Sequence, residues 1–400
     1  MIRVLLVSPL DPKKPGNLKF LVGGENTYTR TLLANSPKGV IYIHHLDALS
    51  RGLVEYTVVQ GLLSIFVKFR ILPLSSGSQC LKIKGDFDLV HAHGYSVQIT
   101  GKKLPIVLSD SSSNYLFLCD YLNWPKWRIK FGYFLRRKIF GLLGLMDADT
   151  NVEEASKLIV FSKFAKKIHQ KLGASKNKIE MIYPGLSTKY SKQSDPVSEE
   201  FYETGSDMIN ILFVGTWFER KGGQLLLGAF KKLSSKYPNA RLTIVGEVPS
   251  HYSSSEGANA TESRSKRRSS RFHSNNIHQY DYVPRERLMR EFFPKADIFV
   301  LVPPKVEGYG FAVVEAMSFG IPVVVSNVCA LPELAEDGKC GFVVKSGNVD
   351  DLYDKLEVLI KDPKLRLKIG EQAKKRFEEK FTSGVMNKKL LSVYKKALKS

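Results

Sequence analysis

Short apolar runs alternate with longer amphipathic stretches along much of the chain. The first run spans residues 3–8, and comparable runs stand at 210–215 and 297–302. Continuous apolar runs of this length are typical of strands buried inside a parallel sheet. Helical stretches such as 224–233 lie between them. The alternation predicts an α/β protein with doubly wound parallel sheets.

The stretch 297–326 predicts a strand, a glycine loop, a helix and a second strand in direct succession. Gly308 and Gly310 flank Tyr309 immediately before a helix expected over 311–318. Glycines leave the backbone N–H groups uncovered, and the positive end of the helix dipole lies at the same place. Both features favour an anion such as phosphate. The sequence therefore predicts an anion-binding loop that follows a buried strand.

Two glutamates accompany this loop. Glu307 stands just before it, and Glu315 lies in the second turn of the helix. A phosphate repels a carboxylate, and an ionised carboxylate only accepts hydrogen bonds, so the pair suits a neutral, hydroxyl-rich group such as a sugar or ribose. Each glutamate alone could equally be a solvated turn or helix residue. Their joint occurrence favours the binding interpretation.

The complete pattern at 303–317 is Pro-x-x-x-Glu-Gly-Tyr-Gly-Phe-x-x-x-Glu-Ala-Met. It resembles the signature of the retaining GT-B glycosyltransferases, which include glycogen synthase, sucrose synthase and the phosphatidylinositol mannosyltransferases. The resemblance implies two doubly wound Rossmann-like domains that face each other across a cleft. It also implies hexosyl transfer from a UDP- or GDP-sugar to a hydroxyl of a glycan or lipid-linked acceptor, with retained anomeric configuration.

The resemblance also implies roles for individual residues in this pattern. Glu307 would hold the transferred sugar and act as a catalytic residue, and Glu315 would hold the ribose hydroxyls of the donor. The backbone of the loop would bind the donor diphosphate, which makes donor-binding candidates of Gly308, Tyr309, Gly310 and Phe311. A GT-B enzyme of this type needs no cofactor and no metal ion, and no Asp-x-Asp metal motif is visible in the chain.

A second motif follows the strand at 210–215. Lys221 and the next glycine match the Lys-Gly part of the Gly-Arg…Lys-Gly pattern with which the family grips the donor diphosphate. Gly215 matches its first glycine, but Thr216 stands where the family has arginine. We expect Arg220 to replace the missing guanidinium, because arginine binds phosphate through two parallel hydrogen bonds. A basic surface loop is the plain alternative.

The N-terminal half shows weaker matches. Gly23 and Gly24 resemble the Gly-Gly loop that faces the donor phosphates in the family. His93 ends a strand that resembles the Asp-x-x-His-x-His motif on the acceptor side, although it could also be a packed core residue. The chain has Asp110 and Ser111 where many relatives carry Thr-x-His. Asp110 is therefore the second acceptor-side candidate, and Ser111 in place of histidine is a departure from the family.

The length of the chain and its composition predict two domains. A chain of 400 residues is too long for one ordinary domain. We expect an acceptor-side domain over 1–190, a polar linker over 191–207 and a nucleotide-sugar-binding domain over 208–380. Low hydrophobicity and high charge predict a mobile insertion at 249–272. By resemblance, a last helix at 381–400 packs back on the first domain.

The net charge of +21 favours anionic partners. Residues 124–145 combine six basic residues and no acidic ones with two tryptophans and several other aromatics. This composition fits an interfacial membrane helix, and it fits equally a core helix with a solvated basic face. The sequence leaves both open. A further basic run at 264–271 would suit a nucleic-acid arm or a solvated loop, although no recognised nucleic-acid-binding module is present.

Three further features argue against a membrane-spanning protein, a secreted protein and a protein stabilised by disulfides or a metal ion. No apolar run reaches the 18 residues of a transmembrane helix, the first residues lack a signal-peptide pattern, and the cysteines are scattered. We expect a cytoplasmic protein, attached peripherally to the inner face of the membrane if 124–145 is interfacial. Two alternatives to the transferase remain: a sugar-nucleotide epimerase of GT-B fold, and a basic nucleic-acid-binding protein.

Overall fold

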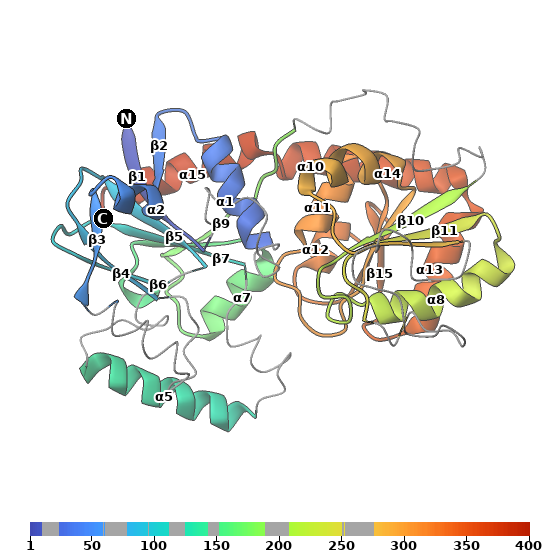
Figure 1. Cartoon of the computed structure of the whole chain (residues 1–400), viewed down its shortest axis with the longest axis horizontal. Coiled ribbons are helices and arrows are strands. Elements are labelled where there is room, and N and C mark those ends of the chain that lie inside the picture. The colour runs from blue at the N-terminus through green and yellow to red at the C-terminus, as the bar shows by residue number, and fades with distance from the viewer. Residues whose placement is uncertain are drawn as a thin grey trace, which may run out of the picture. The chain divides into compact units, whose positions relative to one another are not determined.

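The computed structural model divides into two compact units, Met1–Ser187 together with Lys380–Ser400, and Thr188–Glu379 (Figure 1). These bounds differ by a few residues from the domain boundaries expected from the sequence. The expected linker 191–207 and most of the insertion 249–272 lie outside the described residues. The structure describes residues 1–9, 24–58, 60, 78–94, 96–111, 125–142, 152–188, 208–249, 252 and 276–400.

The first unit is built on a six-stranded sheet with the order β2-β1-β5-β7-β8-β9, and its strands pair in parallel. The register aligns His93 on β5 with Ser109 on β7, so both residues lie at the carboxyl edge of the sheet. The strands are β1 (Ile2–Val7), β2 (Val40–His44), β5 (Leu89–His93), β7 (Ile106–Asp110), β8 (Lys157–Val160) and β9 (Ile179–Met181).

A small second sheet and several helices complete this unit. The small sheet contains β3 (Val54–Tyr56), β4 (Ser78–Ile83) and β6 (Ser96–Thr100) in the order β3-β4-β6. Helix α7 begins at a serine cap, since the Ser162 side chain accepts a hydrogen bond from the Ala165 N–H. The helices are α1 (Gly24–Ala34), α2 (His45–Ser50), α5 (Lys126–Leu142), α7 (Lys163–Lys171) and α15 (Ser383–Ala397).

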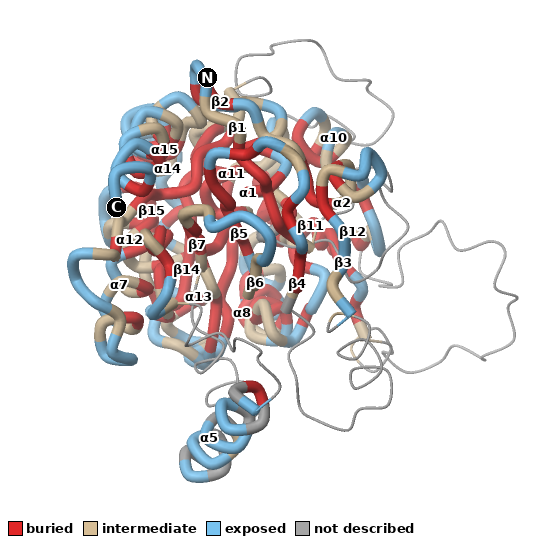
Figure 2. The backbone as a smooth tube through the Cα atoms, turned by 90° about the vertical axis from the view of Figure 1, so that its left-hand side faces the viewer, coloured by how far each residue is buried: buried red, intermediate tan, exposed pale blue. Residues whose placement is uncertain are grey.

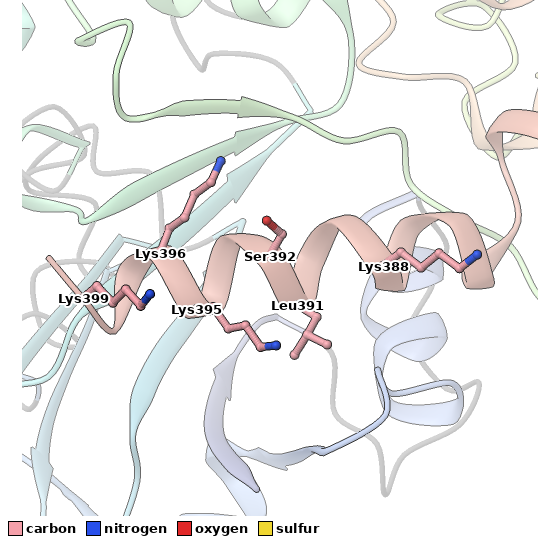
Figure 3. Close-up of a pocket in the computed structure, with 6 residues that line it drawn as sticks. All are labelled: Lys388, Leu391, Ser392, Lys395, Lys396 and Lys399. Atoms are coloured by element: carbon pink, nitrogen blue, oxygen red, sulfur yellow. The ribbon is translucent and has the colours of Figure 1, made fainter.

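Helix α15 belongs to the first unit although it comes last in the chain. Leu186 and Thr382 form a parallel bridge where the chain enters it, and the Tyr394 hydroxyl lies 2.8 Å from that of Tyr42. Tyr394 is fully buried on the inner face of α15. On the other side, a shallow pocket is lined by cationic and small polar or apolar side chains (Figure 3): Lys388, Leu391, Ser392, Lys395, Lys396 and Lys399.

The second unit contains a six-stranded parallel sheet with the order β12-β11-β10-β13-β14-β15. Strand order reverses between β10 and β13, and open parallel sheets bind ligands at the carboxyl ends of strands beside such a reversal. The six strands are β10 (Ile209–Val214), β11 (Ala240–Val245), β12 (Ile277–Tyr280), β13 (Ile298–Leu301), β14 (Val323–Ser326) and β15 (Gly341–Val344). Of these, β13 and β14 are buried at every position, whereas β12 and β15 also have partly buried positions.

The helices of the second unit follow the strands with one deviation from expectation. The sequence predicts a single helix over 285–293. In the structure, a short α10 (Arg285–Arg287) continues as a π-helical turn at Leu288–Phe292 and then as a 3₁₀ turn at Phe293–Lys295. Pro294 explains the change, because it cannot donate the N–H that an α-helix needs. The other helices are α8 (Gly223–Lys236), α11 (Phe311–Ser318), α12 (Leu331–Ala335), α13 (Val349–Lys361) and α14 (Pro363–Lys380).

The two parallel sheets confirm the predicted fold class. Each unit is an α/β, Rossmann-like domain in which buried strands alternate along the chain with helices. The apolar runs that indicated buried strands are buried in the structure, with β5, β13 and β14 inaccessible at every position. The placement of the two domains on either side of a cleft stays a prediction.

Candidate active site

Two loops of the second unit meet at the switch point of its sheet. One follows β10 and carries Lys221; the other follows β13 and carries Glu307. Gly222 makes the meeting possible, because its φ is +87° and a Cβ there would lie 2.0 Å from the carbonyl oxygen of Val302. Such a distance leaves no room for a side chain. The glycine therefore lets the Lys221 loop press against the end of β13.

A buried charge cluster results from this contact. Lys221 Nζ donates a hydrogen bond to Glu307 Oε2, and Arg220 Nη1 lies 3.8 Å from the same oxygen. Burial acts to raise the pKa of the Glu307 carboxyl, but the two cations outweigh it, so the pKa lies below its ordinary value. Glu307 is thus an ionised, nearly inaccessible carboxylate held by two cations.

This lowered pKa predicts a pH dependence of stability. A carboxyl whose pKa is lower in the folded state contributes stability above its ordinary pKa of about 4.3, and the contribution is lost as the pH falls through the folded value. We expect the free energy of unfolding, measured with denaturant from about pH 6 to about pH 2, to fall more steeply in the wild type than in Glu307→Gln. The exposed Glu247→Gln is the control and should keep the wild-type slope. Equal slopes in all three proteins would contradict this prediction.

Arg220 also contacts an aromatic ring. The carbon of its guanidinium lies 4.8 Å from the centroid of the Trp217 ring, which is within cation–π range. Trp217 is 44% exposed, and Thr216 beside it is exposed as well. Gly215 packs behind them, since a Cβ there would lie 2.9 Å from Lys221 Cγ. The structure therefore brings Gly215, Thr216 and Arg220 together around Lys221, as the sequence indicated.

The glycine loop lies beside this cluster and opens α11. Gly310 has a φ of +89°, a left-handed conformation, and a Cβ there would meet the Leu331 side chain at 2.6 Å. Among the described residues, no side chain caps the helix. The first N–H groups of α11 therefore lack a side-chain cap, and such groups suit an anion. Tyr309 and Phe311 pack edge-to-face with their ring centroids 5.1 Å apart and are buried, so they fix the loop from behind.

Glu315 has a partner that sequence reasoning missed. It is 5% exposed, and Arg285 of α10 donates a hydrogen bond to its Oε1. The two residues are 30 positions apart in the chain. One signal in the sequence could have indicated this pair. Arg285 is a basic residue that opens the segment after β12, and it therefore lies at the carboxyl edge of the sheet, as the loop before Glu315 does. Each glutamate of the motif is therefore paired with a cation, whereas the sequence argument considered only neutral partners for them.

The first unit holds the remaining candidates at the carboxyl edge of its own sheet. His93 ends β5 and Asp110 ends β7, the neighbouring strand. Asp110 Oδ2 lies 3.2 Å from Nε2 of His169, a buried residue of α7. Gly24 is the first residue of α1, and Gly23 lies outside the described residues. The predicted residues thus form two groups, one at the carboxyl edge of each sheet.

Within the described ranges, no group of three or more histidine, cysteine, aspartate or glutamate residues is placed to hold a metal ion. In the same part of the chain, no helix combines the length and apolar character needed to cross a membrane.

Comparison with known proteins agrees with this geometry. Residues 198–376 match the family described as Glycosyl transferases group 1. The capsular polysaccharide biosynthesis glycosyltransferase CapM of Staphylococcus aureus is 28% identical over 242 residues, which are 56% of this chain and 57% of CapM. The D-inositol 3-phosphate glycosyltransferase of Corynebacterium aurimucosum is 30% identical over 207 residues, or 50% of this chain and 47% of that protein. The alignments thus span about half the length of these relatives.

Solved structures share the whole fold. HepE of Anabaena in complex with UDP and glucose has a TM-score of 0.63 at 13% identity, over 99% of this chain and 100% of that one. WaaG, a glycosyltransferase involved in lipopolysaccharide biosynthesis, has a TM-score of 0.59 at 15% identity, over 98% of both chains. The fold is therefore the GT-B fold that these structures share. Residues 198–376 form a glycosyl transferases group 1 domain.

Proposed function

We propose that the protein is a retaining glycosyltransferase that moves a sugar from a UDP- or GDP-sugar to a hydroxyl of a glycan or lipid-linked acceptor. The observation that carries the proposal is the buried cluster of Lys221, Arg220 and Glu307 beside the uncapped start of α11. Cations and free N–H groups suit a diphosphate, and a carboxylate next to them suits sugar hydroxyls. The names of CapM and of the inositol phosphate enzyme support the same activity.

Lys221 and Arg220 would stabilise the charge that develops on the leaving diphosphate. The bond from the anomeric carbon of the sugar to the diphosphate oxygen breaks, and a bond from that carbon to the acceptor oxygen forms on the same face. The acceptor proton passes to the leaving phosphate oxygen, so atoms and charges balance. Glu307 would bind sugar hydroxyls while its two cations engage the phosphates. Glu315 would bind the ribose with its second carboxylate oxygen, since Arg285 engages the first.

The test is transfer by the purified protein. UDP- and GDP-sugars are offered singly with glycan and lipid-linked acceptors, and NMR of the product reports the anomeric configuration. We expect one donor to be consumed with retention in the presence of an acceptor. Inversion would refute the retaining mechanism. Conversion of a donor without any acceptor would favour the epimerase, and binding of DNA or RNA that persists at physiological salt would favour the nucleic-acid protein.

We also propose that α5 attaches the enzyme to an anionic membrane surface, which would bring it to a lipid-linked acceptor at the inner face. Three of its aromatic side chains are exposed at helical spacing, with Trp127 at 70%, Phe131 at 60% and Phe134 at 59%, whereas Phe140 near its end is buried. The helix carries six basic residues and no acidic one. Figure 2 shows most of it exposed. An aromatic face on a cationic helix is the composition that binds anionic lipid.

A vesicle assay checks the role of α5. We expect the protein to co-sediment with vesicles of anionic phospholipid and to remain in solution with zwitterionic ones. The triple variant Trp127→Ser, Phe131→Ser, Phe134→Ser should bind about tenfold or more weakly, because burying about 60 Å² of apolar surface already contributes ~1.4 kcal/mol. Leu367→Ser removes an equally exposed leucine from α14 and should bind like the wild type. Binding that is equal for both lipids, or unchanged in the triple variant, would refute the proposal.

A further inference from the structure

A chain of hydrogen bonds runs from the C-terminal helix α15 to His93. Tyr394 Oη lies 2.6 Å from His91 Nδ1, and His91 Nε2 lies 2.9 Å from Ser109 Oγ. Ser109 Oγ is in turn 3.0 Å from His93 Nδ1, which is also 3.1 Å from the carbonyl oxygen of Ser109. At the far end Tyr394 contacts the Tyr42 hydroxyl at 2.8 Å. None of these contacts is part of the charge cluster in the second unit.

The direction of each bond follows from the Ser109 carbonyl. A carbonyl oxygen only accepts, so His93 Nδ1 must carry the hydrogen. Burial lowers the pKa of His93 to about 4 and that of His91 to about 3, so each imidazole is neutral at pH 7 and carries a single N–H. His93 Nδ1–H also points at Ser109 Oγ, which leaves the Ser109 hydroxyl free to donate to His91 Nε2. His91 then holds its hydrogen on Nδ1 and donates it to Tyr394.

His93 is left with an unprotonated Nε2. This atom is buried and has no hydrogen-bond partner within the described ranges. Two rings fix the imidazole in place, since its centroid is 4.7 Å from that of Tyr28 and 5.5 Å from that of Phe161. An unsatisfied buried acceptor costs about 1–3 kcal/mol, so His93 Nε2 suits a ligand that supplies a hydrogen-bond donor. His93 ends β5 at the carboxyl edge of its sheet, where open parallel sheets bind ligands.

We propose that Tyr394 and Ser109 are positioning residues that hold His93 in its Nδ1–H tautomer, so that His93 Nε2 accepts a hydrogen bond from a substrate hydroxyl. The C-terminal helix thereby sets the chemistry of a residue about 300 positions earlier in the chain. The proposal rests on the proposed sugar transfer only for the identity of that hydroxyl, which belongs to the acceptor. The tautomer itself is a property of the protein without substrate.

NMR of the protein labelled with ¹⁵N-histidine measures the tautomer without any activity. We expect His93, whose signal disappears in His93→Asn, to be neutral with its hydrogen on Nδ1 at pH 7. In Tyr394→Phe, His91 loses the acceptor of its Nδ1–H, so we expect His91 to change to the Nε2–H form. His91 Nε2–H would then donate to Ser109 Oγ, and the Ser109 hydroxyl would donate to His93 Nδ1 instead of to His91. His93 should then populate both tautomers. Tyr42→Phe is the matched control, because it removes a hydroxyl from the end of the chain and leaves the bond from His91 to Tyr394 intact.

Kinetics with the acceptor found in the transfer assay give the second readout. We expect Tyr394→Phe to raise the KM for the acceptor about 3- to 10-fold and to leave the KM for the donor unchanged, because one neutral hydrogen bond is weakened. Ser109→Ala keeps the carbonyl that accepts from His93 Nδ1–H and removes the hydroxyl that could donate to it, so this variant should keep the Nδ1–H tautomer. A wild-type His93 with its hydrogen on Nε2, or an unchanged tautomer and acceptor KM in Tyr394→Phe, would overturn the proposal. Failure of the transfer assay alone would refute the proposed function and leave the tautomer result standing.

Discussion

Lys221→Ala should lower kcat/KM for the sugar nucleotide about 10²- to 10³-fold. Lys221 is the cation closest to Glu307 and lies in the loop that Gly222 presses against β13. A preorganised donor aimed at developing negative charge is worth roughly this factor in enzymes that stabilise a leaving or tetrahedral oxyanion. Initial rates with the donor identified by the transfer assay measure the effect. Lys232→Ala is the matched control, because its partner Asp350 is exposed and lies outside the site.

The same substitution should also destabilise the protein, so the two effects must be separated. Removing one partner of a buried ion pair costs about 3–5 kcal/mol, and Arg220 at 3.8 Å retains part of the compensation. The double variant Lys221→Ala, Glu307→Gln removes the uncompensated carboxylate. We expect it to recover most of the lost free energy of unfolding without recovering transfer. A double variant or a single variant with turnover like the wild type would remove Lys221 from the site.

Gly222→Ala should destabilise the second unit by about 2–5 kcal/mol. A left-handed φ costs a residue with a Cβ about 1–2 kcal/mol, and forcing a methyl group into a packed position costs about 1–3 kcal/mol more. The obstacle is the backbone carbonyl of Val302 at 2.0 Å, which cannot rotate away as a side chain could. A fall in melting temperature of about 10 °C is expected for a unit of this size. Donor turnover should fall as well, because Lys221 is the next residue.

Gly228→Ala provides the control for Gly222→Ala. Gly228 lies inside α8, and a Cβ there would meet only Val349 side-chain atoms at 3.4 Å or more, an ordinary contact. Alanine is a better helix former than glycine by about 1 kcal/mol, so this variant should be as stable as the wild type or slightly more so. A Gly222→Ala protein with unchanged melting temperature would contradict the close approach of the two loops.

Much of the second unit could be predicted from the sequence, because its signals are local. The strand at 297–302 is a continuous apolar run, and the glycines on either side of Tyr309 mark the turn into α11. Lys221 and its glycine form a compact motif of the same kind. These patterns depend on the positions of a few neighbouring residues, so no knowledge of distant contacts is needed to find them.

The pairs that span long stretches of chain were not predictable. Arg285 signals only that a basic residue opens the segment after β12, without naming Glu315 as its partner, and Tyr394 gives no signal that it contacts His91 across 303 residues. Such contacts depend on which strands are neighbours in the sheet and on where α15 packs. The sequence also left two interpretations of 124–145 open. The exposure of Trp127, Phe131 and Phe134 supports the proposal that α5 is interfacial, and the vesicle assay tests it.

The α/β class, the glycine loop at Gly308 and Gly310, and the resemblance to GT-B glycosyltransferases can all be found from the sequence alone. Each follows from apolar periodicity, from glycine chemistry or from a short motif, and all of these are local along the chain. The partners of the buried polar groups become visible only in the folded protein. Folding pairs Glu307 with Lys221 and links His93 to the C-terminal helix. The physical reason is that the charge state of a carboxylate and the tautomer of an imidazole are set by burial and by partners that folding brings together.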